Sequence, residues 1–244
     1  MQDAEKERQT RGWDKWDPVA SLNLVLREEP GGEGHHGSFL VFRKLEQNVR
    51  GFHQALTDLA GVLGCDREKA GAMAVGRFRD GSPIVPPQQP EANNFNYKEQ
   101  DPEGQVCPFH AHIRKTNPRG DSPIGLEGER AFRIARRGIT YGDRPDLVPG
   151  TNTLPPQAGI GLLFMSFQAG LDQFAIQQEG ADSNDFARPG VGVDAVYGNN
   201  STPVPQQWPS GSDKKFTIAN FVTLKGGEYF FAPSLAFLRG LAMD

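Results

Sequence analysis

Residues 38–45 are Ser-Phe-Leu-Val-Phe-Arg-Lys-Leu, an aromatic and β-branched run that follows Gly37. A run of this kind, bounded by glycine, is typical of a buried strand. Asn48 then offers a helix cap, and apolar residues recur at helical spacing over 49–63 until Gly64 ends the pattern. The sequence therefore predicts a strand that leads directly into an amphipathic helix.

The rest of the chain continues this alternation. The further elements predicted are an extended segment over 21–27, a short helix over 67–75, strands over 132–139, 158–167 and 216–224, a helix over 169–178, a turn at 225–227 with a strand pairing back over 228–232, and a final helix over 233–243. From residue 38 the main order is strand, helix, strand, strand, helix, strand. That order suits a ferredoxin-like α+β fold, an antiparallel sheet with helices on one face. We expect a polar lead-in over 1–20 and one domain over 21–244.

The composition is that of an ordinary globular protein, with 37% hydrophobic and 23% charged residues among 244. The net charge is −4 and the basic residues form no single run, which argues against a nucleic-acid partner. No stretch approaches the roughly 20 apolar residues of a membrane span, and the charged N-terminus is unlike a signal peptide. Cys65 and Cys107 are too few for a disulfide framework, so a cytoplasmic setting is expected.

Two histidines stand in the stretch over 107–119, which is Cys-Pro-Phe-His-Ala-His-Ile-Arg-Lys-Thr-Asn-Pro-Arg. A neutral imidazole can bind haem iron through one ring nitrogen while the other donates to a carboxylate or carbonyl. By spacing alone His110 and His112 are equal candidates, and either could simply satisfy local hydrogen bonds. A metal site on both histidines has no Cys, Asp or Glu at ligand spacing to support it.

Further along the chain, Arg136 and Arg137 precede Gly-Ile-Thr-Tyr-Gly. A guanidinium stays cationic and offers fixed donors to a developing oxyanion. Because a strand alternates faces, only one of the two arginines can point to a given side, and both could equally be surface residues. Leu162 and Phe164 share one face of their predicted strand, as either core residues or the lining of a cavity.

In this order the motifs resemble the C-terminal, haem-binding half of the dye-decolourising peroxidases, a family of haem b enzymes. The stretches over 37–48 and 226–234 match the same half, so the resemblance runs from about Trp16 to the end of the chain. It implies that the chain forms one of two ferredoxin-like halves that pack together, which is half of a dimeric α+β barrel arrangement.

The resemblance also implies a role for each candidate residue. His112, directly before Ile-Arg, would be the iron ligand, and Asp194 in Gly-Val-Asp-Ala-Val-Tyr-Gly its carboxylate partner. Arg136 would polarise hydrogen peroxide on the opposite side of the haem b. Leu162 and Phe164 would line the cavity on that side and restrict access to the iron.

One family residue has no counterpart, namely the acid–base aspartate of a Gly-x-x-Asp-Gly loop. The nearest string, over 76–81, has one residue too many and follows the first strand instead of preceding it. We therefore expect a peroxidase that uses hydrogen peroxide and an aromatic reductant, with the missing half supplied by a second chain or through a homo-oligomer, unless the sequence is a fragment that lacks this half. The alternatives are a haem-binding or storage module without efficient turnover, and a haem-free interaction domain.

Overall fold

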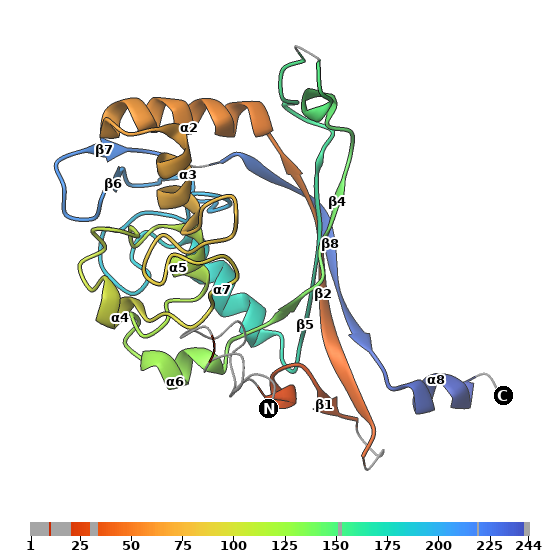
Figure 1. Cartoon of the computed structure of the whole chain (residues 1–244). Coiled ribbons are helices and arrows are strands. Elements are labelled where there is room, and N and C mark those ends of the chain that lie inside the picture. Colours follow the sequence, from red (N-terminus) through yellow and green to blue (C-terminus); the bar gives the residue numbers. More distant parts are fainter. Residues whose placement is uncertain (1–9, 11–20, 30–33, 151–152, 219, 242–244) are drawn as a thin grey trace. The chain divides into compact units, whose positions relative to one another are not determined.

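The computed structural model describes Thr10 and residues 21–29, 34–150, 153–218 and 220–241 (Figure 1). The predicted polar lead-in lies outside the described residues, except for Thr10. The chain divides into two compact units. Unit 1 contains residues 1–20, 50–130 and 177–221, and unit 2 contains residues 21–49, 131–176 and 222–244. The prediction of one domain over 21–244 stays a prediction.

Unit 2 is built on an antiparallel sheet whose long strands lie side by side in Figure 1. The central strand β2 (His36–Gln47) pairs with β8 (Val222–Ala232) on one side and with β5 (Gly161–Gln168) on the other. The short strands β3 (Ala135–Arg136) and β4 (Ile139–Tyr141) pair with the far edge of β5.

In chain order the four principal strands are β2, β3 with β4, β5 and β8. Across the sheet they lie in the order β8, β2, β5, β3, which is fourth, first, third, second, and every neighbouring pair is antiparallel. Helices follow the first and third of these strands in the chain. This arrangement confirms the predicted α+β, ferredoxin-like fold class. A further short strand, β1 (Arg27–Glu28), pairs with the start of β2.

Seven helices lie in the described part of the chain. They are α2 (Val49–Leu63), α3 (Arg67–Val75), α4 (Tyr97–Gln100), α5 (His112–Thr116), α6 (Gly125–Arg130), α7 (Asp172–Asp182) and α8 (Leu235–Leu241), with 3-10 turns at Leu22–Leu24 and Pro145–Leu147 and a small sheet of β6 (Gln206–Gln207) and β7 (Lys215–Phe216). The predictions for α2 and α3 are confirmed at both ends. Those for β5, α7 and α8 are confirmed with shifted ends. The side chain of Asp66 caps α3 by accepting the N–H of Lys69.

The predicted turn at 225–227 is wrong. β8 runs through these residues as one strand from Val222 to Ala232. Its register against β2 shifts at this point, because Lys44 faces Gly226 while Leu45 faces Leu224. Lys225 is therefore the extra residue of a β-bulge, which a pair of glycines accommodates as readily as a turn.

Two other predicted elements differ from the structure. The segment over 21–27 is a 3-10 turn followed by β1, because the Ser21 hydroxyl accepts the N–H of Asn23 and starts a helical turn. The single strand predicted over 132–139 is instead the pair β3 and β4, interrupted at Gly138. A glycine inside a strand commonly marks such an irregularity.

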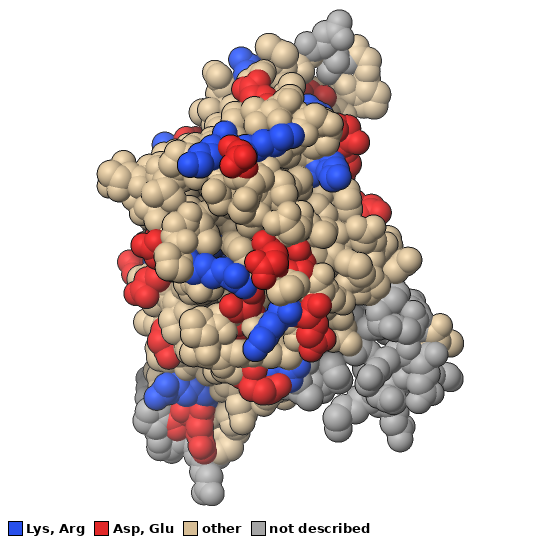
Figure 2. Space-filling model, turned by 90° about the vertical axis from the view of Figure 1, so that its left-hand side faces the viewer, with Lys and Arg blue, Asp and Glu red and all other residues tan. Residues whose placement is uncertain are grey.

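The hydrophobic core of unit 1 joins α2 and α3 to distant loops. Leu59, Ala70, Val85, Trp208 and Ile218 are among its fully buried members. Figure 2 shows basic and acidic side chains interspersed on the face drawn. Within the described residues, no helix is both long and apolar enough to cross a membrane.

Candidate functional site

His112 and Asp194 form a close polar pair within unit 1. Nδ1 of His112 lies 2.8 Å from Oδ2 of Asp194, although the two residues are 82 positions apart in the chain. The Asp194 side chain is fully buried, whereas that of His112 is 20% exposed. Because the carboxylate accepts Nδ1–H, Nε2 is the nitrogen left to bind a ligand.

The backbone around Asp194 holds its carboxylate in place. Oδ1 accepts the N–H groups of Val196 and Tyr197 at 2.7 and 3.1 Å, while the N–H of Asp194 donates to Ala181 in α7 at 2.8 Å. The Tyr197 ring contacts the His112 ring edge-on, with 5.3 Å between centroids. Both carboxylate oxygens are thus occupied, and the imidazole is held in one orientation.

His110 has a different environment. It is buried against the ring of Trp208, with 4.2 Å between centroids, and burial lowers the pKa of the imidazole to about 3. The ring is therefore neutral at physiological pH. No carboxylate of the described residues forms an ion pair with it. Among the described residues, no three His, Cys, Asp or Glu side chains gather as a metal site. Of the two histidines, the geometry favours His112 as a ligand.

The other three candidates lie together in unit 2. Arg136 on β3 faces Ser166 on β5, and directly opposed residues of an antiparallel pair share one face of the sheet. Leu162 and Phe164 precede Ser166 by four and two positions, so they lie on that same face. Arg137 is one position along, and its backbone N–H donates to Met165. The structure thus brings Arg136, Leu162 and Phe164 to one face of one sheet.

Several known proteins similar to this chain are named as dye-decolorizing or DyP-type peroxidases. No family model matches it. The multifunctional dye peroxidase DyP2 of Amycolatopsis is 45% identical over 98% of this chain, and its solved structure superposes with a TM-score of 0.83. The dye-decolorizing peroxidase AauDyP1 of Auricularia auricula-judae is 37% identical over 84% of the chain. A DyP-type peroxidase from Anabaena superposes with a TM-score of 0.82 at 38% identity over 98% of the chain.

The chain is similar to dye-decolorizing peroxidases over 98% of its own length. It aligns to the C-terminal portion of the relatives. It spans 57% of the length of the Amycolatopsis protein, 46% of AauDyP1 and 54% of the Anabaena structure.

The residues present fit the haem of dye-decolorizing peroxidases. A histidine that ligates haem iron usually donates its second ring N–H to an acceptor, and the His112–Asp194 pair supplies this arrangement. Nε2 of His112 has no hydrogen-bond partner in the described part of the chain, so it can take a ligand. The face with Arg136 also carries buried polar atoms without partners, those of Ser166 and Gln168.

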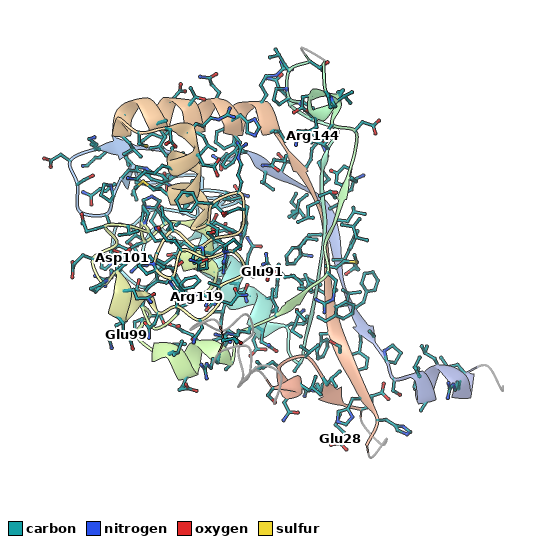
Figure 3. The ribbon with its side chains drawn as sticks, viewed as in Figure 1. Glu28, Glu91, Glu99, Asp101, Arg119 and Arg144 are labelled. Carbon is teal, nitrogen blue, oxygen red and sulfur yellow. The ribbon has the colours of Figure 1, made fainter. Side chains whose placement is uncertain are left out.

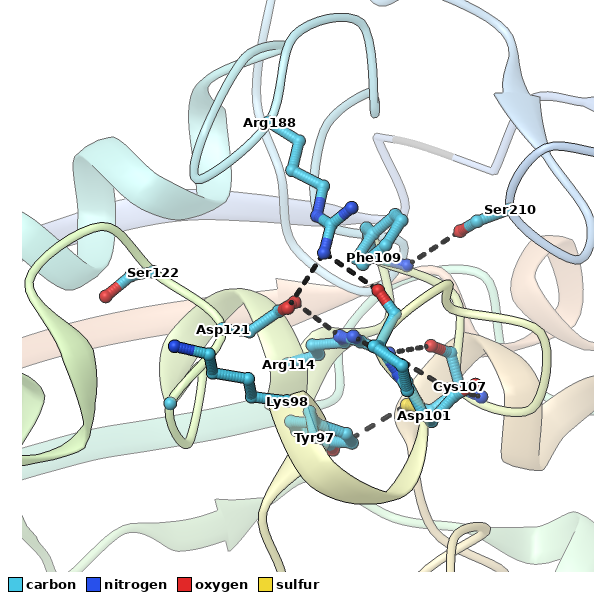
Figure 4. A network of polar contacts seen from close by, with 12 residues as sticks. Tyr97, Lys98, Asp101, Cys107, Phe109, Arg114, Asp121, Ser122, Arg188 and Ser210 are labelled. Carbon is cyan, nitrogen blue, oxygen red and sulfur yellow. Dashed lines mark hydrogen bonds and ion pairs between the residues drawn. The ribbon is translucent and has the colours of Figure 1, made fainter.

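Arg114, two positions after His112 on α5, anchors this part of the chain (Figure 4). Its guanidinium donates to the side chain of Asp121 at 2.9 Å, and to the side chain of Asp101 at 3.0 Å and its carbonyl at 2.9 Å. It also lies 4.5 Å from the ring centroid of Tyr97 and 4.4 Å from that of Phe109. The role of Arg114 is not evident from the sequence, because its partners lie in loops on either side of the motif.

Further cations reinforce the same loops. Arg188 donates to Asp121 at 3.3 Å and stacks on Phe109 at 4.1 Å from the ring centroid. Figure 3 shows Asp101 and Arg119 among the loops of unit 1, where Arg119 lies 4.0 Å from the ring centroid of Phe95. These charges stabilise long loops that contain little regular structure.

Lys115 is the next residue of α5 and is also buried. Its Nζ donates to the carbonyl of Ser183, one residue beyond the end of α7, at 2.7 Å. Burial lowers the pKa of Lys115 to about 8, against the opposing effect of Asp194, Asp185 and Asp182. Lys115 therefore connects the helix of His112 to the end of α7, where the backbone of Asp194 also binds.

Cys107 has no environment for nucleophilic chemistry. Its thiol is fully buried and donates to the Tyr97 hydroxyl at 3.6 Å. Burial raises the pKa of Cys107 to about 12, so the thiol stays protonated at neutral pH. The cysteine is a structural residue of the turn that leads to His112.

Proposed function

We propose that this chain is the haem-binding half of a peroxidase that reduces hydrogen peroxide and oxidises dyes or phenolic compounds. The observation that carries the proposal is the buried carboxylate of Asp194 on Nδ1 of His112, which leaves Nε2 for iron. The names of the relatives, dye peroxidases and dye-decolorizing peroxidases, support the same reaction class.

Each residue has a separate task in this proposal. His112 holds the iron of haem b, and Asp194 orients the imidazole and strengthens it as a donor. Haem, when bound, would supply the redox chemistry by which two electrons pass from the aromatic reductant to peroxide. The guanidinium of Arg136 binds peroxide and polarises its O–O bond. Leu162 and Phe164 limit which molecules come close.

The remaining half of the fold is also part of the proposal. The relatives are about twice as long as the aligned portion. The family resemblance implies that the acid–base aspartate belongs to the part that this chain does not match. β8 and α8 expose many large apolar side chains, which a partner would cover. They are Leu224, Tyr229, Phe230, Phe231, Leu235, Phe237, Leu238 and Leu241. We propose that the N-terminal half of the family fold is the occupant.

The cellular setting is proposed on a separate basis. Cys65 and Cys107 are both unpaired, as is usual for proteins of a reducing compartment. We therefore propose a cytoplasmic location.

A haem titration tests the proposal directly. The purified chain should bind one haem with the absorbance of a histidine-ligated high-spin iron, and His112→Ala should abolish this binding. His35→Ala, at an exposed histidine, is the matched control and should bind as the wild type does. Equal binding by His112→Ala would contradict the assignment.

Peroxide turnover is then measured with and without the N-terminal half of a relative. Turnover that requires the added half supports the peroxidase and its partner. Turnover by a self-associated chain, with its mass measured by light scattering, would favour a homo-oligomer. Haem binding without turnover in any combination would favour the storage module.

A further inference from the structure

Two buried side chains on β5 have polar atoms that bind nothing. Ser166 and Gln168 are fully buried, and neither the Ser166 hydroxyl nor either atom of the Gln168 carboxamide has a hydrogen-bond partner among the described residues. Burying a polar group without a partner costs free energy, so native proteins rarely retain one without a reason. Three such atoms within three residues of one strand indicate a missing polar ligand.

Their position on the sheet identifies the neighbourhood of that ligand. Ser166 lies directly opposite Arg136, which places their Cβ atoms about 5 Å apart on the same face. Gln168 is two positions further along β5, and Phe164 is two positions back, so all four residues share this face. The unpartnered atoms therefore belong to residues on the same face of the sheet as Arg136, the exposed arginine to which we assign peroxide.

The chemistry of Arg136 leaves part of a peroxide molecule unbound. A guanidinium has donors only, whereas hydrogen peroxide is both a donor and an acceptor. Its two protons need acceptors, and a serine hydroxyl and a glutamine carbonyl are both acceptors. Neither group is basic enough to keep a proton, so each would orient the molecule and would not act as a general base.

We propose that Ser166 and Gln168 are substrate-positioning residues that bind hydrogen peroxide, or the water that precedes it, next to Arg136. The inference rests on the proposed function and extends it to two residues. The Ser166 hydroxyl and the Gln168 carbonyl accept the O–H groups, and the Gln168 amide donates to a peroxide oxygen. The bound molecule supplies the hydrogen bonds that the protein lacks.

The sharpest test compares Gln168 with Gln206, a fully buried glutamine whose carboxamide is satisfied. Gln206 donates to the carbonyls of Val193 and Ile218 and accepts the N–H of Ile218. In urea unfolding of the chain alone, Gln206→Met should lower the midpoint. Gln168→Met and Ser166→Ala should leave it unchanged or raise it. A fall for Gln168→Met equal to that for Gln206→Met would overturn the proposal, because it would mean that the carboxamide has structural partners.

The second measurement concerns function in the haem-loaded chain with its added half. Ser166→Ala and Gln168→Met should each slow the reaction with hydrogen peroxide tenfold or more, with haem affinity unchanged. Rates equal to the wild type would contradict the proposal.

A third measurement separates this inference from the peroxidase proposal. In the chain without haem, the side-chain amide signal of Gln168 should shift in NMR spectra on addition of hydrogen peroxide, while that of Gln206 should not. If the wild type fails to turn over but this shift occurs, the site stands and the proposed function fails. If no shift occurs, the site itself is wrong.

Discussion

One carboxylate oxygen of Asp194 accepts the Nδ1–H of His112 at 2.8 Å, while backbone N–H groups bind its other oxygen. The second oxygen accepts the N–H groups of Val196 and Tyr197, so the carboxylate cannot turn away from the imidazole. A group fixed on both sides in this way sets the tautomer of the histidine, which bears its proton on Nδ1 and leaves Nε2 free.

Asp194→Asn should therefore reverse the tautomer while retaining the fold. The amide oxygen of asparagine can still accept the two backbone N–H groups, but its NH₂ then faces Nδ1 of His112. Nδ1 becomes the acceptor, the proton moves to Nε2, and haem affinity should fall about 10- to 100-fold. A haem titration measures the loss, and nitrogen NMR of the chain alone reports the tautomer. Unchanged haem affinity would show that Asp194 is not the functional partner.

Arg114→Met should be strongly destabilising, because it leaves the buried carboxylate of Asp101 without its cation and that of Asp121 with Arg188 alone. Removing one partner of a buried ion pair costs about 3–5 kcal/mol of unfolding free energy. Arg188→Met is the matched control. Its side chain is 39% exposed, and it should cost about 1 kcal/mol or less. Urea unfolding gives both values, and equal losses would mean that Arg114 is no more important than a surface residue.

The elements that sequence predicted best are those whose signals are local. α2 has a helical apolar pattern, a candidate capping residue and a terminal glycine, while the shorter α3 lies between Asp66, which caps it, and Gly76. Both ends of each helix were predicted correctly. The prediction of a turn at 225–227 was wrong because Gly-Gly accommodates both a turn and a bulge, and only the pairing of β8 with β2 decides between them.

The candidate site likewise depends on contacts between residues that lie far apart in the chain, which local sequence signals do not reveal. Nothing local links His112 to Asp194 across 82 residues, so only the family resemblance could pair them. Arg114 and Lys115 lie in a basic stretch that is typical of a solvated surface, yet both are buried. Their partners, such as Asp101 and the Ser183 carbonyl, come from loops whose paths the sequence does not reveal.

Gly198→Ala should disrupt the turn that positions Asp194. A Cβ at this position would lie 2.6 Å from the carbonyl oxygen of Asp194 and 2.7 Å from its nitrogen, and backbone atoms cannot move aside locally. We expect a loss of about 1–3 kcal/mol in unfolding free energy, typical of overpacking, with weaker haem binding. Gly61→Ala in α2 is the control, since nothing lies within 4 Å of its added Cβ. It should stabilise the helix by up to about 1 kcal/mol, and a loss at Gly61 similar to that at Gly198 would contradict the steric argument.

Lys115 should make stability rise with pH in a window that the structure defines. Burial lowers the pKa of Lys115 from 10.5 to about 8, so between these values the folded chain has lost a proton that the unfolded chain still holds. Stability increases with pH wherever the unfolded state binds more protons. The Lys115 contribution to unfolding free energy should therefore grow from pH 8 to pH 10.5, by at most about 1.4 kcal/mol per pH unit.

Lys115→Met should lose this slope and should also show a constant offset from the broken hydrogen bond to Ser183. Lys98→Met, at an exposed lysine, is the control, and its stability curve should run parallel to that of the wild type. Urea midpoints at several pH values give the three curves. A difference between wild type and Lys115→Met that stays flat across the window would show that the ammonium is hydrated in the folded protein.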